Sequence, residues 1–333
     1  MKKSWRFVSF MTSSLLVSLA LLTASFSFVS AHAASPGAVT ATKLPASFYA
    51  PYQDMTIGKP SLQAVMKSTG QKYFTLAFIT SSGCKYSWGG STPTLTSDLS
   101  YIRSHGGDVM ISFGGEAGTE LALACKNVSS LQAQYQSVIN TYKVSHLDFD
   151  IEGGTEGDVT SYTRRNTALA ALQKANPGLT IDFTLPSNPT GPTSDDMGLL
   201  NNAKAKGVHF SIVNLMTMDY DGPDTHMGKD AIEAANAMYS KLKGMYPSET
   251  TAQLWAMVGL TNLIGQNDTP GEIFTLNDAR LVLTFAQQKH IGELSLWEVS
   301  RDNGSCPGSS DDNDTCSSIA QSTYAFTNIF KAF

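Results

Sequence analysis

The chain has 333 residues, of which 42% are hydrophobic and 15% are charged, a composition that suits a globular protein with a large core. The formal net charge is -5, and no basic run follows the first few residues. These features exclude nucleic acid as an expected partner and favour a neutral or cationic substrate. A single domain of about 300 residues would fit a (β/α)8 barrel.

The start of the chain predicts export. Its positive residues are Lys2, Lys3 and Arg6. A mostly apolar stretch follows at 15–29, and the small residues Ala31 and Ala33 suit cleavage before Ala34. We therefore expect a secretory signal peptide at 1–33 and a secreted, extracellular mature protein that is not held in a membrane after signal cleavage.

The four cysteines are expected to be oxidised in that compartment. Cys306 and Cys316 flank a Gly/Ser/Asp-rich loop and form one natural pair, which leaves Cys84 with Cys125. A metal site is not expected, because the cysteines lack CxxC-type spacing.

Apolar strand-like runs alternate with helix-like runs after a short lead-in at 34–45. Strict alternation predicts parallel strands with right-handed crossovers, and thus a single α/β domain at 46–333, a (β/α)8 TIM barrel. The expected strands are 48–52, 73–80, 108–113, 146–152, 180–185, 211–220, 254–260 and 293–299. The expected helices are 61–68, 96–105, 130–143, 159–176, 195–206, 229–246, 277–290 and 317–330.

Three acidic residues dominate the expected fourth strand. Asp148, Asp150 and Glu152 share one face because side chains alternate along a strand, while the residues between them are apolar. Gly153 and Gly154 end the strand, so the acids lie at its carboxyl end, where parallel α/β folds bind ligands.

Three interpretations of this ladder remain open at this point. It could be a solvated acidic face, or a site for a hard cation such as magnesium or calcium. It could also perform general acid/base work, because closely spaced carboxyls cannot all ionise and one stays protonated near neutral pH.

The ladder resembles the strand-four signature DxxDxDxE of glycoside hydrolase family 18, the chitinases. The match is at Asp148, Asp150 and Glu152, whereas Ser145 replaces the first aspartate of the signature. Residues 112–115 resemble the SxGG motif, in which Gly114 and Gly115 make room beside the acids. The resemblance covers essentially all of the mature chain, and the run 258–302 is similar to secreted bacterial chitinases that lack the inserted α+β subdomain.

The resemblance implies further substrate-binding residues. Trp297 matches the tryptophan that forms the floor of the sugar site. The MxYD motif of strand six fits in two registers, either with Tyr220 and Asp221 or with Met218 and Asp219 at the last two positions. We favour Tyr220 as the functional phenol. The aromatic residues proposed as sugar-stacking surfaces, each with a core role as the alternative, are Tyr49, Tyr52, Tyr86, Trp88 and Trp255.

The resemblance also implies a mechanism without a metal or organic cofactor. Glu152 is expected to be the general acid, and the acetamido oxygen of the substrate itself is expected to attack the anomeric carbon. Asp150 and Tyr220 would hold the acetamido group, and Asp148 would share a proton with Asp150. The expected partners are chitin or chito-oligosaccharides, and the protein is expected to be a monomer.

Other functions remain open. An endo-β-N-acetylglucosaminidase acting on N-glycans shares the acid ladder, and a non-catalytic chitin-binding lectin on the same fold differs by loss of the acid. The acidic run 311–314 could bind calcium, but its spacing is not that of an EF-hand, and a solvated turn is the preferred interpretation.

Overall fold

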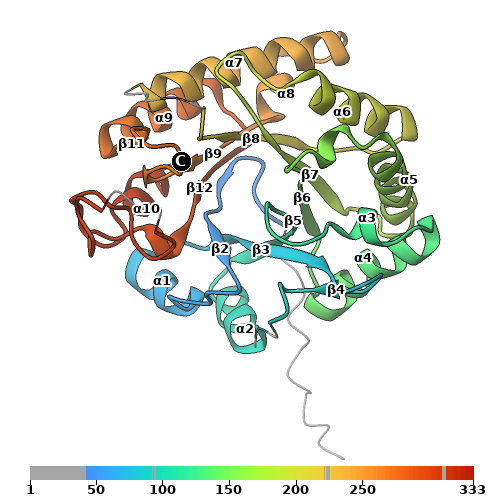
Figure 1. The fold of residues 1–333 in the computed structure, drawn as a ribbon, viewed down its shortest axis with the longest axis horizontal. Coiled ribbons are helices and arrows are strands. Elements are labelled where there is room, and N and C mark those ends of the chain that lie inside the picture. The colour runs from blue at the N-terminus through green and yellow to red at the C-terminus, as the bar shows by residue number, and fades with distance from the viewer. Residues whose placement is uncertain (1–42, 92, 94, 221, 223–225, 310–312) are drawn as a thin grey trace, which may run out of the picture. The chain divides into compact units, whose positions relative to one another are not determined.

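The computed structural model describes residues 43–333 except 92, 94, 221, 223–225 and 310–312. The predicted signal peptide, most of the lead-in and half of the acidic run 311–314 therefore lie outside the described residues. Within the unit formed by residues 39–333, the described part has strands in an inner ring and helices around it (Figure 1).

Nine parallel strands form one curled sheet in this part of the chain, in the order β1-β12-β9-β8-β7-β6-β5-β3-β2. This arrangement confirms the predicted α/β (β/α)8 barrel. The strands are β1 (Phe48–Tyr49), β2 (Tyr52–Asp54), β3 (Tyr73–Ser81), β5 (Asp108–Gly114), β6 (His146–Asp150), β7 (Thr180–Pro186), β8 (Ile212–Thr217), β9 (Val258–Leu263) and β12 (Glu293–Trp297). Three short strands lie outside this ring: β4 (Tyr86–Ser87), β10 (Gly265–Gln266) and β11 (Ile273–Phe274).

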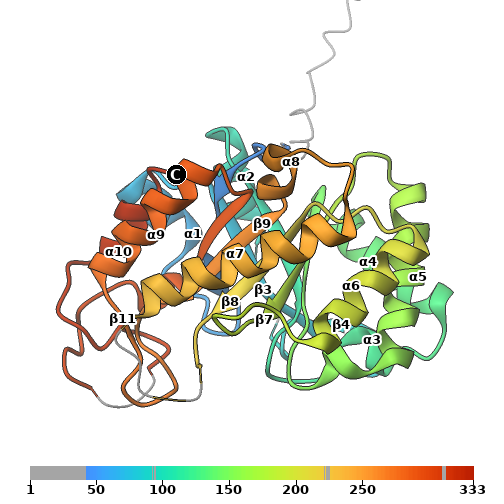
Figure 2. The same ribbon diagram turned by 90° about the horizontal axis from the view of Figure 1, so that it is seen from above.

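The helices form the outer layer, and α4, α5 and α6 pack against one another in chain order (Figure 2). The helices are α1 (Leu62–Thr69), α2 (Thr96–Ser104), α3 (Leu121–Ala124), α4 (Val128–Tyr142), α5 (Val159–Ala175), α6 (Ser194–Lys206), α7 (Met227–Met245), α8 (Thr251–Ala256), α9 (Leu276–Lys289) and α10 (Ala325–Phe330).

The first barrel strand is divided into β1 and β2, which pair with the two strands that flank the closure. Ala50 N donates to Leu294 O of β12 at 3.1 Å, whereas Pro51 O accepts from Thr75 N of β3 at 3.0 Å. Pro51 has no N–H to donate, so the division falls where the ladder loses a donor. This switch of partners closes the ring.

An aromatic stack covers the outer face of the acidic strand. Phe149 of β6 stacks on Phe113 of β5 at 5.1 Å between ring centroids and lies 6.1 Å from Phe183 of β7. Tyr135 of α4 meets Phe149 edge-on at 5.2 Å. The apolar face of β6 is thus buried under the helix layer, as the sequence pattern predicts.

Two predicted elements differ from the structure. Leu254 lies in α8 rather than in a strand, because Thr250 and Gln253 form a capping box that starts a helix there. The predicted helix 317–330 is reduced to α10, whose first turn is held by the Asp302 carboxylate, an acceptor for the N–H groups of Phe326 and Thr327. The other predicted helices and strands are present with shifted ends.

The structure confirms both predicted disulfides, Cys84–Cys125 and Cys306–Cys316, with Cα separations of 4.6 and 6.1 Å. Reduction should lower the melting temperature without removing the site, because each bond contributes at most about 2–5 kcal/mol by restricting the unfolded chain. The Cys84–Cys125 bond closes the longer loop and should contribute more. Calorimetry with and without a reductant checks this, and an unchanged melting temperature would contradict it.

None of the helices in the described part of the chain is long and apolar enough to cross a membrane.

Candidate active site

The acids of β6 point into the barrel. Asp148 pairs in register with Ser112 of β5 and Asp182 of β7, and Asp150 pairs with Gly114 and Thr184. Strand β6 ends at Asp150, but Ile151 N still donates to Thr184 O at 2.9 Å. The extended course therefore continues, and Glu152 follows Asp150 at the carboxyl end of the strand, as the ladder predicts.

Asp148 is held by three hydroxyl groups from other strands. Tyr52 OH and Ser112 Oγ donate to its Oδ2 at 3.0 and 2.6 Å, and Thr184 Oγ1 donates to its Oδ1 at 2.8 Å. Burial raises the pKa of Asp148 to about 6, and the charge of Asp182 adds to this, although the hydroxyl donors oppose it. Asp148 is therefore poised to exchange a proton near neutral pH.

Asp150 and Glu152 form a coupled pair above Asp148. Burial, followed by the charges of Glu152 and Asp148, raises the pKa of Asp150 well above its usual range. Burial and the charge of Glu116 raise the pKa of Glu152 to about 7, partly offset by a hydrogen bond from Asp150. The two carboxyls are hydrogen-bonded to each other, so they share a proton and titrate as one set rather than as two independent residues.

One oxygen of Asp150 is left for an external donor. Asp150 is 3% exposed, and no group in the described part of the chain donates to its Oδ1. A buried carboxyl oxygen without a donor is costly, so it marks a place where a ligand N–H or O–H fits.

Gly114 and Gly115 make this arrangement sterically possible. Gly114 has φ +109°, and a Cβ there would lie 1.9 Å from the Asp150 carbonyl oxygen. A Cβ on Gly115 would lie 2.5 Å from the Phe78 ring. Gly114 therefore lets the backbone of β6 come close, and Gly115 leaves room for the Phe78 ring. A residue with a side chain would clash at either position.

Trp297 lies at the end of β12 in a cluster of rings. It stacks on Phe78 with 5.3 Å between centroids and 14° between planes, and it lies 5.8 Å from Tyr52. The Tyr52 hydroxyl is hydrogen-bonded to Asp148, so Trp297 lies near the acidic residues of β6. Both the Ala77–Phe78 and the Trp297–Glu298 peptide bonds are cis.

The model of glycosyl hydrolases family 18 matches residues 46–262, which is more than half of the chain. The chain belongs to glycosyl hydrolase family 18. This match confirms the resemblance inferred from the acidic ladder, and it includes β6 and the strands on both sides of it.

Individual relatives carry chitinase names. A protein of Escherichia coli (strain K12) described as a probable bifunctional chitinase/lysozyme is 37% identical over 314 residues, 87% of this chain and 35% of that protein. Endochitinase 11 of Metarhizium anisopliae is 39% identical over 277 residues, 78% of this chain and 53% of that protein. The family 18 chain thus spans about a third and about half of these two relatives.

A solved structure supports the same fold. Catalytic-site mutants of active domain 2 of a thermostable chitinase from Pyrococcus furiosus, complexed with chito-oligosaccharides, match with a TM-score of 0.80. The two chains are 35% identical, and the match covers 87% of this chain and 95% of that one.

The MxYD motif lies at the end of the sixth barrel strand, β8, where two registers are possible. Asn214 of β8 donates to Thr184 Oγ1 at 3.1 Å and therefore faces the barrel interior. Alternation places Met216 on the same face, and the strand ends at Thr217. Tyr220 instead packs as a half-buried ring against the main hydrophobic core, and its N–H donates to Glu272 at 2.8 Å.

Both registers of this motif stay predictions, because strand β8 ends at Thr217, before the residues that distinguish them. Asp219 has φ +50°, and its Oδ1 accepts from Thr269 N at 2.9 Å, so it joins the loop after β8 to the β10–β11 segment. Asp221 lies outside the described residues. The role of Tyr220 as a functional phenol stays a prediction.

Two predicted sugar-stacking residues, Tyr49 and Trp88, lie in the core instead. Tyr49 is 4% exposed and packs edge-on against Phe330, and Trp88 is 3% exposed and donates to Tyr142 OH at 2.8 Å. The prediction is wrong for both, because residues distant in sequence cover their rings.

Three further aromatic residues have other roles. Tyr52 is 1% exposed and donates to Asp148, so it supports an acid rather than a sugar ring. Trp255 is buried against Tyr239, and Tyr86 is half-buried against the core. The contact of Phe78 with Trp297 is a feature that sequence reasoning missed, since Phe78 lies in an apolar strand and no motif singled it out.

No group of three histidine, cysteine or acidic side chains in the described residues is arranged to hold a metal ion.

Proposed function

We propose that this protein is an exported chitinase that cleaves β-1,4 bonds between N-acetylglucosamine residues with retention, using the substrate's own acetamido group as the nucleophile. The observation that carries this proposal is the donor-free Oδ1 of Asp150, buried beside the Glu152 carboxyl. An acetamido N–H is a donor that suits this oxygen. The names of the relatives and the oligosaccharide complex of the Pyrococcus furiosus domain support chitin as the substrate class.

Glu152 acts as the general acid in this reaction. Its raised pKa keeps the carboxyl protonated up to about pH 7, so that it can give its proton to the glycosidic oxygen as the bond breaks. The resulting carboxylate then takes a proton from the attacking water. Protonated Glu152 is required for the first step, so the rate should fall as the pH rises through the pKa of Glu152.

Asp150 and Asp148 orient and stabilise the nucleophile. The acetamido oxygen attacks the anomeric carbon, and a cyclic oxazolinium forms while the leaving sugar departs. Asp150 accepts the acetamido N–H and offsets the positive charge that develops on the ring. Asp148, held by Tyr52, Ser112 and Thr184, accepts the proton of Asp150 and leaves that carboxyl negatively charged.

Export is proposed from the first part of the chain. A positive start, an apolar stretch at 15–29 and the small residues Ala31 and Ala33 are typical of a signal peptide. The two disulfides support this proposal because such bonds persist in oxidising compartments.

The test is dependence on the acetamido group. Chito-oligosaccharides should be cut, while cellulose and fully deacetylated chitosan should not, because neither offers the internal nucleophile. Time-resolved NMR should show the β-anomer at the new reducing end before mutarotation. An initial α-anomer, or cleavage of cellulose, would contradict the mechanism.

A high-mannose glycoprotein is a useful second substrate. Preferential release of its glycans over cleavage of chito-oligosaccharides would replace the chitinase assignment with that of an endo-β-N-acetylglucosaminidase.

A further inference from the structure

The barrel closes at a seam between its last strand, β12, and its divided first strand, β1 and β2. β1 pairs with β12 and β2 pairs with β3, so the backbone ladder of the first strand changes sides at Pro51. Beyond this point Asp54 N, at the end of β2, donates to Glu298 Oε2 at 2.5 Å. Glu298 directly follows β12, so its carboxyl links the two edges of the seam at the carboxyl end of the barrel.

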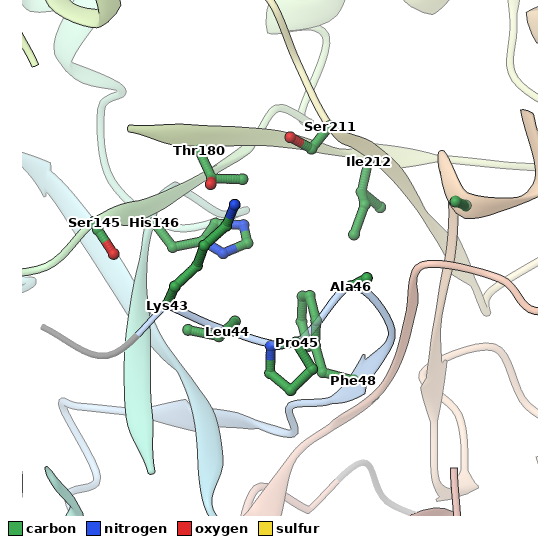
Figure 3. Close-up of a pocket in the computed structure, with 11 residues that line it drawn as sticks. Lys43, Leu44, Pro45, Ala46, Phe48, Ser145, His146, Thr180, Ser211 and Ile212 are labelled. Carbon is green, nitrogen blue, oxygen red and sulfur yellow. The ribbon is translucent and has the colours of Figure 1, made fainter. Parts of the chain in front are cut away.

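The amino-terminal end of the seam is closed by backbone instead. Phe48 and Tyr49 of β1 lie in register with the first two residues of β12. A pocket of about 430 Å³ lies at this end, and Figure 3 shows Phe48 and His146 at its wall. The pocket is lined by residues at the starts of β6, β7 and β8, whereas the acids lie towards the other end of β6. The side-chain link at Glu298 thus belongs to the end of the barrel where the substrate is expected.

The hydrogen bonds around Glu298 require a proton on its carboxyl. Ser300 Oγ forms a short hydrogen bond with Glu298 Oε1 and lies 2.7 Å from Asp314 O. A hydroxyl has one hydrogen to donate, and a carboxylate and a carbonyl can only accept. An ionised Glu298 would therefore leave one of the two contacts without a hydrogen. When Glu298 is protonated, it donates to Ser300 Oγ, and the Ser300 hydroxyl donates to Asp314 O in the Cys306–Cys316 loop.

The surroundings of Glu298 support the protonated state. Glu298 is 1% exposed, and burial, followed by the charges of Asp54 and Asp314, raises its pKa to about 8, although two hydrogen bonds oppose the rise. Both of these charged neighbours are acidic, and Arg301 of the same turn donates to backbone carbonyl oxygens. The carboxyl thus keeps its proton below about pH 8 and loses it above that pH.

Glu298 is connected to both rings of the stack beside the acids. Trp297 precedes it in the chain and stacks on Phe78 with 5.3 Å between ring centroids. Asp54, which Glu298 holds, lies in register with Ala77, the residue before Phe78. The Glu298 carboxyl therefore holds together the two backbone segments on which the position of this stack depends.

We propose that Glu298 is a positioning residue that, in its protonated form, joins β12 to β2 and holds Trp297 in place as a sugar-binding surface. This inference rests on the proposed function, because the position of Trp297 matters through the affinity for chito-oligosaccharides. Ionisation removes the hydrogen that joins Glu298 to Ser300. Affinity should therefore be full below about pH 8 and fall above it.

Binding of a soluble chito-oligosaccharide, measured by calorimetry, tests the role of the carboxyl. All variants are made in the Glu152→Gln protein, the parent, so that binding is measured without turnover. Glu298→Ala removes both hydrogen bonds and should raise Kd about 3–10-fold at about pH 6.5, the range expected for one or two lost hydrogen bonds. Glu298→Gln keeps an acceptor for Asp54 N–H and a donor for Ser300 Oγ, so it should restore most of the affinity.

The same measurement at about pH 9.5 tests the role of the proton. The ratio of the parent Kd to the Glu298→Gln Kd should rise about 3–10-fold from the lower to the higher pH, because the amide has no proton to lose. The other acids of the site are common to both proteins, so the ratio isolates Glu298. Asp54→Asn should move the midpoint of this rise to lower pH, because it removes an acidic charge next to Glu298. The matched control, Glu233→Gln on the exposed surface of α7, should follow the parent.

A readout without substrate separates the inference from the proposed function. The fluorescence of Trp297, taken as the difference between the parent and Trp297→Phe, should change with a midpoint near pH 8. This change should be absent from Glu298→Gln. A wild type that neither binds nor cleaves chito-oligosaccharides would refute the proposed function, and the fluorescence titration would then decide the inference by itself.

Three outcomes would overturn the inference. Parent-like affinity of Glu298→Ala at about pH 6.5 would mean that the carboxyl does not position Trp297. A Glu298→Gln protein that binds as weakly as Glu298→Ala would mean that the ionised carboxyl is the working form. The third is an identical pH dependence of the parent and Glu298→Gln, in affinity or in fluorescence. Should Glu298→Ala fail to fold, Ser300→Ala takes its place, because it removes the acceptor of the Glu298 proton and should raise Kd about 3-fold.

Discussion

Replacing Glu152 by Gln should abolish hydrolysis of chito-oligosaccharides while leaving the fold and oligosaccharide binding largely intact. The amide keeps the shape of the side chain but cannot donate a proton to the glycosidic oxygen, and loss of general acid catalysis lowers rates by about 10²–10⁴-fold. Initial rates on a chito-oligosaccharide, binding by calorimetry and a melting curve measure the three effects.

The matched control is Glu233→Gln on the surface of α7, where the same substitution should leave the rate unchanged. Near-wild-type turnover by pure Glu152→Gln protein would remove Glu152 from the role of acid. Loss of binding and fold together with activity would show that the substitution does not isolate the chemical step.

Removing the charge of Glu120 should destabilise the protein by about 3–5 kcal/mol, because it leaves Arg165 buried without a counter-ion. Arg165 of α5 is fully buried, and its Nε and Nη2 donate to the two Glu120 carboxyl oxygens at 3.1 and 2.9 Å. Urea unfolding of Glu120→Gln measures the change in the free energy of unfolding.

Two comparisons make this result specific to the buried pair. Glu233 forms an exposed ion pair with Lys229 at 3.2 Å, so Glu233→Gln should change stability by only about 0.3–0.5 kcal/mol. The double variant Glu120→Leu with Arg165→Leu should lose less than Glu120→Gln, since neither charge remains buried. Equal effects of Glu120→Gln and Glu233→Gln would refute the argument.

Features with a local cause could be predicted from the sequence. The position of three acids on one face of β6 follows from the two-residue period of a strand, and the cover on the other face follows from its apolar residues. The Cys306–Cys316 pair is close in sequence, and the alternation of strands and helices indicated a barrel.

Predictions failed where a residue type is equally common in two kinds of environment. Tyr49, Tyr52 and Trp88 are aromatic residues whose sequence context allows either a core or a sugar-binding role. Their burial depends on Phe330, Asp148 and Tyr142, which belong to other parts of the chain. Leu254 looked like part of a strand because the apolar run continues through it, but the local capping box decided for a helix.

What the sequence alone determined about this protein is the set of acids, their order along one strand and the glycines that leave them room. These properties depend on covalent geometry and on neighbours within a few residues. What the tertiary structure decided is the protonation chemistry of the set. Tyr52 is 96 residues from Asp148 in sequence, and Asp182 is 36 residues from its partner His146. Barrel closure and strand register bring these groups together and remove them from water, and a pKa responds to that burial and to those contacts.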